Sequence, residues 1–320
     1  MNPTINPDKL KQKIIDHFKS QGLEFDSDGN VTTELTPRQL HGTNKRQPKQ
    51  TLFSSKIDPN NIKPRLVLCE TKEAKAEFKE LSQRNWSTEH TQQRGRMMCY
   101  IIYDEGHNTP MGILGLSSPV ISVAGRDRYL GIKGNDSQAK INLAMNLFRC
   151  GGIEPYHEFY ASRLAALLSV SKEIRDDFRN KYDSELVFCV TMGAYGKTPI
   201  YDRHRVGGQK LSWFTGYSHG SGTFTIPDSL FRDMKNYLRQ EGVDVDKKQG
   251  RQKLKLSGRC LGMLGLKGGT KHGIKRACYL LTACTNLMDV LHKEAEPNIT
   301  DFTVDNLVEE WRNKYLARVK

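Results

Sequence analysis

The chain has 320 residues, a net charge of +13 and a mean hydropathy of -0.61, values that suit a soluble protein with one large or two modest domains. No run of about 18 apolar residues is present, so no membrane span is expected, and the N-terminus lacks the charged and apolar segments of a secretory signal. We therefore expect a cytoplasmic protein whose positive charge favours anionic partners.

The N-terminal region is expected to begin with a helix. Residues 6–8 read Asn-Pro-Asp, in which asparagine caps the helix, proline suits its first position and the acid complements its dipole. This pattern predicts a helix that runs to about Ser20. A short helical piece is predicted over Thr36–Leu40, and the polar, basic stretch Gly42–Ser55 predicts a connecting segment.

The next part of the chain predicts strands around one helix. Arg65–Cys69 has the composition of a strand and Thr71–Gln83 that of a helix. Met97–Tyr103 and Pro110–Leu116 form the two halves of a predicted hairpin, because a turn rich in Asp, Gly and Asn separates them. A further short strand is predicted over Val120–Val123.

The stretch after residue 136 mixes helices and strands. We predict helices over Ser137–Phe148, Glu158–Leu168, a segment capped by Ser171, and Asp228–Gln240. We predict strands over Leu186–Thr191, Lys210–Tyr217 and Gly222–Ile226, the last two paired around a Gly/Ser turn. Since strands and helices do not alternate strictly, the expected fold class is α+β, with a mixed, largely antiparallel central sheet flanked by helices.

The composition changes after Gly242. Residues 244–250 are a candidate hinge, and helices are predicted over Lys271–Leu291 and, with an amphipathic pattern, over Phe302–Ala317. We therefore expect a helical N-terminal segment and linker (1–55), a central α/β domain (56–242) and a basic, helical C-terminal region (243–320).

The seven cysteines do not form a recognisable framework. Their number is odd, their spacing is scattered and no CxxC pair is present. Apolar neighbours, such as Phe188 and Val190 on either side of Cys189, predict reduced core thiols, not disulfides or a zinc site. A Walker A loop is also absent, and we expect neither a metal nor a cofactor.

The basic residues near the C-terminus carry the main functional signal. Residues 247–288 contain ten Lys or Arg residues and no Asp or Glu. A phosphate backbone attracts such a surface whatever the base sequence, and Lys271, at a predicted helix start beside glycines, suits an anion site. The alternative is a solvated surface that acids elsewhere in the fold neutralise. The candidate nucleic-acid contacts are Lys253, Lys255, Arg259, Lys271, Lys275 and Arg276, with Lys197 and Arg203 extending the track.

Four residues are candidates for a catalytic pocket: Arg126, Asp127, Tyr195 and His219. Asp127 stands between two arginines, either as a buried, paired organiser or as a surface ion pair of little energetic value. Tyr195, two positions before a lysine, suits phosphate binding or base stacking as well as packing on the core. His219 lies in a Gly-rich turn, where an acid–base role competes with plain solvation. Because no HExxH, GxSxG or Cys–His arrangement is found, catalytic activity stays open.

Several of these clusters recur in one order in a known family. The elements that carry the likeness are Arg38–His41, Arg94–Asp104, Gly112–Pro119, Arg126–Arg128 with Gly131, Pro155–Tyr156, Leu164–Ser169, Tyr195–Lys197, Tyr201–Arg203 and Thr215–Phe224. The stretch from Arg38 to Leu238 resembles the Druantia DruA-like family, and the basic C-terminal region lies outside the resemblance. The chain departs from the usual pattern at Ile132, where a tryptophan is common, and over His157–Ala161, which replaces a glycine-rich entry.

The resemblance implies a component of a bacterial multi-gene anti-phage defence system. Such systems include a large helicase-like protein, so the implied partners are other proteins of the operon and nucleic acid, with no membrane. Two alternatives stay open: an enzyme with an acyltransferase-like or nuclease-like pocket, and an assembly subunit whose basic face docks on an acidic partner protein.

The order of elements is also similar to that of the GNAT-like acetyltransferase core. The pyrophosphate loop of such enzymes is not found near Pro155–Arg163. This second similarity therefore implies the shape alone and not acetyl-coenzyme A chemistry.

Overall fold

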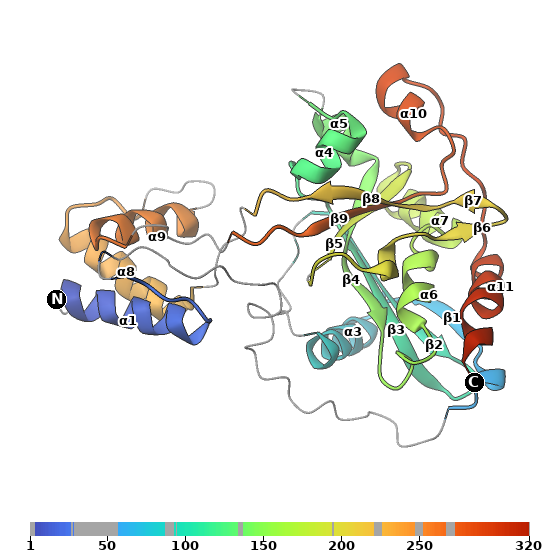
Figure 1. The fold of residues 1–320 in the computed structure, drawn as a ribbon, viewed down its shortest axis with the longest axis horizontal. Coiled ribbons are helices and arrows are strands. Elements are labelled where there is room, and N and C mark those ends of the chain that lie inside the picture. The colour runs from blue at the N-terminus through green and yellow to red at the C-terminus, as the bar shows by residue number, and fades with distance from the viewer. Residues whose placement is uncertain are drawn as a thin grey trace. The chain divides into compact units, whose positions relative to one another are not determined.

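The computed structural model describes residues 4–26, 28, 57–86, 93, 95–133, 137–193, 195–220, 226–246, 252–266 and 273–319. The chain divides into two compact units (Figure 1). The helical unit comprises Met1–Lys45 and His219–Lys275, and the sheet unit comprises Arg46–Ser218 and Arg276–Lys320. The domain boundaries expected from composition, after residues 55 and 242, stay a prediction about which pieces fold independently.

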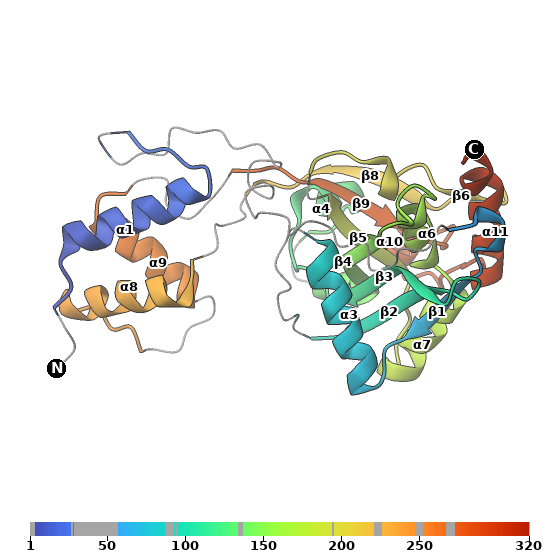
Figure 2. The same ribbon diagram turned by 90° about the horizontal axis from the view of Figure 1, so that it is seen from below.

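Three helices pack together in the described part of the helical unit (Figure 2). They are α1 (Pro7–Ser20), α8 (Asp228–Gln240) and α9 (Gln252–Met263). The side chain of Asn6 accepts a hydrogen bond from the Lys9 backbone N–H at 3.0 Å, so the predicted cap of α1 is confirmed. The apolar faces of the three helices form one core, which contains Leu10, Ile14, Phe18, Leu230, Met234, Leu238, Leu256, Cys260 and Leu261.

A seven-stranded sheet forms the centre of the sheet unit. The strand order is β1-β2-β3-β4-β5-β9-β8, and every neighbouring pair is antiparallel except β4 and β5. The strands are β1 (Pro64–Leu68), β2 (Met97–Asp104), β3 (Thr109–Ser117), β4 (Ala144–Gly152), β5 (Phe188–Gly193), β8 (Ser212–Tyr217) and β9 (Ala277–Leu281), and β6 (Arg205–Val206) pairs with β7 (Gln209–Lys210) in a separate ribbon. The α+β class and the largely antiparallel sheet are confirmed.

Helices flank the sheet. They are α3 (Lys72–Asn85), α4 (Ala124–Leu130), α5 (Ser137–Asn142), α6 (Ala161–Leu168), α7 (Lys172–Tyr182), α10 (Leu287–Lys293) and α11 (Val304–Lys314). Side chains alternate between the two faces of a strand, and β2 shows this: Tyr100 packs in the cluster that contains residues of α6, α7 and α11, whereas Ile101 packs in the cluster around α3. No described helix has both the length and the apolar character needed to span a membrane.

Three predicted elements are corrected. The predicted helix Ser137–Phe148 is only the short α5 followed by β4, because residues 144–148 pair with β3 and β5 in the centre of the sheet. The predicted helix Lys271–Leu291 contains β9, whose five residues are all buried between β5 and β8. A fully buried strand and a buried helix segment have the same apolar pattern. Residues 120–123 form a loop, not a strand.

Two predictions concern residues that the structure leaves partly or wholly undescribed. The short helix over Thr36–Leu40 lies outside the described residues, as does most of the predicted strand Gly222–Ile226. The described partner of β8 is β9. The helix α9 was not predicted, since its sequence has two glycines and no acid in its first turn.

Candidate nucleic-acid interface

On α4, the buried side chain of Arg126 forms an ion pair with the partly buried carboxylate of Asp127. The Arg126 side chain is 1% exposed, and its Nε donates to Asp127 Oδ1 at 2.7 Å. Its two terminal nitrogens donate to the backbone carbonyl oxygens of Val120 at 2.7 Å and Ile121 at 2.8 Å. The other carboxylate oxygen of Asp127 accepts from the Val123 N–H at 2.7 Å and the Ser122 hydroxyl at 3.1 Å.

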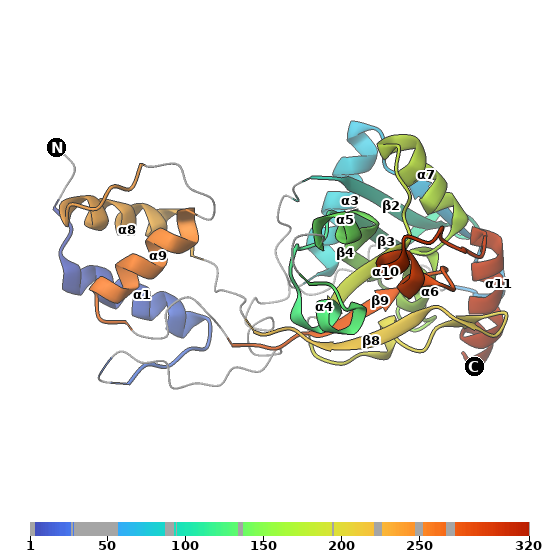
Figure 3. The same ribbon diagram turned by 90° about the horizontal axis from the view of Figure 1, so that it is seen from above.

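Asp127 is therefore a paired, partly buried organiser, nearer to the first of its two alternatives than to a surface ion pair. Its hydrogen bonds connect α4 to the preceding loop, residues 120–123, which we call the clamped loop. The short C-terminal turn of α4 ends at Gly131, which has a φ of +64°, and α4 lies beside β8 (Figure 3). The guanidinium N–H groups of Arg126 and the carboxylate oxygens of Asp127 form hydrogen bonds within the protein. We therefore do not propose that these two residues act on a substrate.

Tyr195 and Lys197 lie on the surface at the end of β5. Tyr195 is 47% exposed and Lys197 is also exposed. The turn between them needs glycine: Gly196 has a φ of +99°, and a Cβ on Gly193 would lie 2.4 Å from the Gly196 carbonyl oxygen. The Lys197 ammonium lies 4.5 Å from the centre of the Phe214 ring, a cation–π contact.

An aromatic cluster extends from this lysine across β8 and β9. The Phe214 ring lies 5.2 Å from that of Tyr217 and 5.8 Å from that of Tyr279, which in turn lies 5.6 Å from Tyr201. Tyr217 is 48% exposed. We call Tyr195, Lys197, Phe214 and Tyr217 the aromatic surface. Exposed rings beside a cation suit stacking on bases next to a phosphate backbone.

Arg203 follows the 3-10 helix Pro199–Tyr201 and is exposed, with a φ of +64°. Lys197 and Arg203 thus lie on either side of one short helix of the sheet unit. The neighbouring His204 is buried and belongs to the interior. The Tyr201 hydroxyl donates to the Cys150 carbonyl oxygen at 3.0 Å, so this tyrosine anchors the segment.

In the helical unit, α9 presents a basic face. Leu256, Ser257, Cys260 and Leu261 are buried on one side, which leaves Lys255 and Arg259, one turn apart, exposed on the other. Among the described residues no ion pair forms on Arg259. Lys253 is exposed and bonds to the exposed carboxylate of Asp228 at 2.8 Å, and this hydrogen bond lowers the pKa of Asp228.

The remaining candidates are distributed as follows. Lys275 is exposed at the end of the helical unit, and Arg276 precedes β9 in the sheet unit, where burial lowers the pKa of its guanidinium. His219 is exposed and belongs to the helical unit, whereas Arg126, Asp127 and Tyr195 belong to the sheet unit. Lys271 lies outside the described residues.

Comparison with known proteins decides the family. The sequence matches the family described as Druantia protein DruA over residues 30–293. The chain belongs to the Druantia DruA family. A relative named Druantia protein DruA, from Escherichia coli (strain UMEA 4076-1), is 24% identical over 343 residues, which cover 94% of this chain and 84% of that protein. No solved structure matches, so the GNAT-like shape stays a prediction.

The family match also corrects one expectation. The sequence resemblance was limited to residues 38–238, with the basic segment outside it. The matched residues extend to residue 293 and therefore include residues 247–288 with their ten cations. The basic segment is part of the DruA family's own sequence, not an addition to it.

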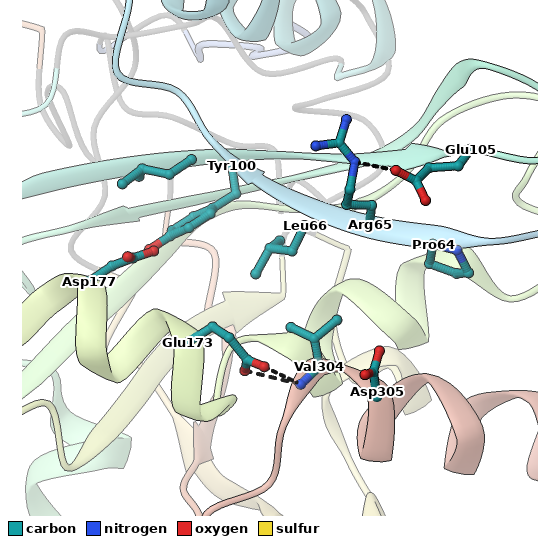
Figure 4. Close-up of a pocket in the computed structure, with 10 residues that line it drawn as sticks. Pro64, Arg65, Leu66, Tyr100, Glu105, Glu173, Asp177, Val304 and Asp305 are labelled. Atoms are coloured by element: carbon teal, nitrogen blue, oxygen red, sulfur yellow. Dashed lines mark hydrogen bonds and ion pairs between the residues drawn. The ribbon is translucent and has the colours of Figure 1, made fainter.

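This DruA-family chain also has an acidic pocket in the sheet unit, which sequence reasoning missed (Figure 4). It has a volume of about 350 Å³ and lies between β1, β2, α7 and the start of α11. Its carboxylates are Glu105, Glu173, Asp177 and Asp305. The turn after β2 contributes Glu105, α7 contributes Glu173 and Asp177, and α11 contributes Asp305, so no local motif could have indicated the pocket.

The chemistry of this pocket is opposite to that of the basic candidates. Burial raises the pKa of Asp177, and the negative charges of Glu70, Asp176 and Glu173 raise it further, against a hydrogen bond from Tyr100. The Tyr100 hydroxyl donates to Asp177 at 2.9 Å. A polyanion would be repelled here, so the pocket does not belong to the proposed phosphate contacts.

The cysteines of the DruA-family chain are all buried and free. Burial raises the pKa of the Cys189 thiol to about 12, so the thiol stays protonated and unreactive at neutral pH. Among the described residues, no three His, Cys, Asp or Glu side chains come together in a way that could hold a metal ion.

Proposed function

We propose that the protein is a component of a bacterial Druantia anti-phage defence system and that it contacts nucleic acid. The family match supports the first part. The single observation that carries the second is the face of α9, where Lys255 and Arg259 are exposed within a 42-residue segment that has ten cations and no acid. We further propose that other proteins of the operon, including a helicase-like subunit, are its partners.

The α9 face has a second property that suits a phosphate backbone. Gly258 lies between Lys255 and Arg259 and Gly262 lies one turn on, and a Cβ at either glycine would have nothing within 4 Å. Packing inside the protein therefore does not require these glycines, although each destabilises a helix by about 1 kcal/mol relative to alanine. Their absent side chains let a ligand backbone approach the helix closely between the two cations.

We expect the double change Lys255→Gln and Arg259→Gln to weaken nucleic-acid binding roughly 10- to 100-fold at low salt, because two phosphate contacts are lost. The slope of log affinity against log salt concentration should fall by about 2, or about 0.9 for each contact. Fluorescence anisotropy of labelled DNA and RNA, titrated at several salt concentrations, measures both quantities.

The matched control removes the same charge from another helix of the same unit. Lys9 and Lys19 are exposed on α1, and Lys9→Gln with Lys19→Gln should leave the affinity within about 3-fold of the unchanged protein. If the wild-type chain binds neither DNA nor RNA at low salt, the nucleic-acid proposal is wrong. If the α9 variant instead stops co-purifying with an acidic protein of the operon while DNA binding persists, the face is a protein-docking surface.

Gly258→Ala separates binding from stability. The substitution should stabilise α9 by about 0.5–1 kcal/mol, since alanine has the higher helix propensity and no neighbour obstructs its Cβ. At the same time it should weaken nucleic-acid binding several-fold by holding the phosphate backbone away. Thermal unfolding by circular dichroism and the same anisotropy titration provide the two readouts, and a more stable variant with unchanged affinity would show that no ligand contacts this face.

A further inference from the structure

The clamped loop exposes two adjacent apolar side chains. Val120 is 52% exposed and Ile121 is 61% exposed. Single exposed apolar residues are normal on a protein surface, but two in succession at the tip of one loop leave a continuous apolar edge in water. Nothing in the folding of the sheet unit gains from their exposure, because the core is formed by other residues.

The backbone beneath these side chains is held from inside the protein. The buried guanidinium of Arg126 bonds to the carbonyl oxygens of these same two residues, and Asp127 bonds to the N–H of Val123 and the hydroxyl of Ser122. Burying an ion pair has a desolvation cost that its mutual attraction often does no more than match. Here the pair fixes an exposed apolar tip in one conformation, so the tip is rigid before it meets a partner.

The surroundings of the loop are basic and aromatic. Residues 106–153 contain five Lys or Arg residues and only two acids, but Arg126 and Arg149 are buried and bond within the protein. Arg128 and Lys133 are exposed shortly after the loop. On the other side, Val120 lines a small cavity together with Tyr279, and Tyr279 belongs to the aromatic cluster on which Lys197 lies.

We propose that Val120 and Ile121 form a wedge that enters a base step of double-stranded DNA. This inference rests on the proposed nucleic-acid function and names the ligand of the sheet unit. Proteins that bend DNA insert apolar side chains between base pairs, partly unstack them and gain contacts to the bent backbone. A rigid wedge loses little conformational entropy on insertion, and the exposed Arg128 and Lys133 that follow the loop in sequence would meet the flanking phosphates.

The exposed cations that follow the loop favour DNA over a protein as the partner of the wedge. An apolar tip that docks in a protein groove does not need flanking cations, whereas an apolar tip that opens a duplex must stay close to two phosphate backbones. Pyrimidine–purine steps unstack most easily, so the wedge should enter there. The exposed rings of Tyr195 and Tyr217 are available to stack on a base that the wedge displaces.

The test uses the full chain and short DNA duplexes that each carry one 2-aminopurine at a TA step. The fluorescence of 2-aminopurine rises when the base is unstacked. We expect a rise of several-fold when wild-type protein saturates the duplex at low salt. The double variant Val120→Ser and Ile121→Ser should still bind the duplex through its phosphate contacts, with an affinity within about 10-fold of the wild type. It should leave the 2-aminopurine stacked, so that its fluorescence stays low.

The control variant carries Met97→Ser and Met288→Ser, which remove two other exposed apolar side chains of the sheet unit, 39% and 46% exposed. It should behave like the wild type, and both variants should keep the wild-type thermal unfolding temperature. A fluorescence rise that persists in the loop variant, or a saturated wild-type complex with no rise, overturns the wedge while leaving the nucleic-acid proposal intact. Absence of any DNA binding overturns both, and loss of a bound operon protein in the loop variant without an effect on DNA assigns the loop to protein docking.

Discussion

Replacing Asp127 by alanine will destabilise the sheet unit by about 3–5 kcal/mol, because the change leaves the buried guanidinium of Arg126 without its carboxylate. Arg126 is 1% exposed, and the same substitution removes the acceptor for the Val123 N–H and the Ser122 hydroxyl. For a unit of this size the midpoint of thermal unfolding should fall on the order of 10 °C.

Tryptophan fluorescence measures this unit alone. The three tryptophans of the chain, Trp86, Trp213 and Trp311, all belong to the sheet unit. The matched control is Asp289→Ala, which removes a surface carboxylate that pairs with Lys293 at 2.8 Å and should cost less than about 1 kcal/mol. A free energy of unfolding for Asp127→Ala within about 1 kcal/mol of the wild type would show that the pair does not clamp the loop.

A double-mutant cycle isolates the pair itself. Arg126→Met should also be strongly destabilising, since the carbonyl oxygens of Val120 and Ile121 lose their donors. The double variant should cost less than the sum of the two single changes by about 1–3 kcal/mol, because it buries no unpaired charge. This outcome also distinguishes a structural pair from a catalytic one: a catalytic Asp127 would lose activity on substitution while the fold stayed stable.

The parts of the fold that follow from local chemistry could be predicted from the sequence. The caps predicted at Asn6 and Ser171 each accept a backbone hydrogen bond in the structure, and the hairpin of β2 and β3 depends on a turn that its own residues encode. These signals involve residues that are close in sequence. The helix α8 was predicted with the bounds that it has, because its apolar residues repeat with the period of a helix.

The parts that depend on distant partners could not be predicted. The segment Ala277–Leu281 is a strand because β5 and β8 lie on either side of it, and neither neighbour is near in sequence. The pairing of Arg126 with Asp127 could be proposed from their adjacency, but not the loop that they hold. The acidic pocket combines residues from both ends of the sheet unit, and a sequence scan sees these carboxylates as isolated surface charges.

The two proposed nucleic-acid contacts, one on each unit, would contribute different kinds of interaction. The face of α9 offers cations and a close approach, which give affinity without sequence preference. The clamped loop and the aromatic surface offer apolar and stacking contacts, which depend on whether the duplex opens. High salt should therefore weaken the first contact much more than the second, because only the first depends mainly on charge.

Acid will destabilise the sheet unit through His204, by up to about 3 kcal/mol. The His204 side chain is buried, with Nε2 2.7 Å from the Ile200 carbonyl oxygen. Burial lowers the pKa of His204 to about 4, the hydrogen bond to Ile200 opposes this change, and the positive charges of Arg163 and Lys314 support it. Asp202 contributes a small opposing effect, and the ring of Tyr315 packs edge-on at 6.3 Å.

The direction in which the free energy of unfolding changes with pH follows from proton binding by the folded and unfolded chains. The pKa of histidine in an unfolded chain is about 6.5, so between pH 6.5 and pH 4 the unfolded chain binds a proton that the folded chain does not. The free energy of unfolding therefore rises with pH in this window. The contribution of His204 is fully present above pH 6.5 and is lost as the pH falls toward 4.

Urea unfolding followed by tryptophan fluorescence between pH 4.5 and pH 7.5 measures the effect. His204→Gln cannot bind the proton, so its stability should decline less steeply on acidification, and the gap to the wild type should narrow by about 2–3 kcal/mol across the window. The same substitution at His157, a partly exposed histidine of the sheet unit that pairs with Glu154, should leave the steep decline in place. Parallel curves for the wild type and His204→Gln would mean that His204 takes up its proton as readily in the folded chain as in the unfolded one.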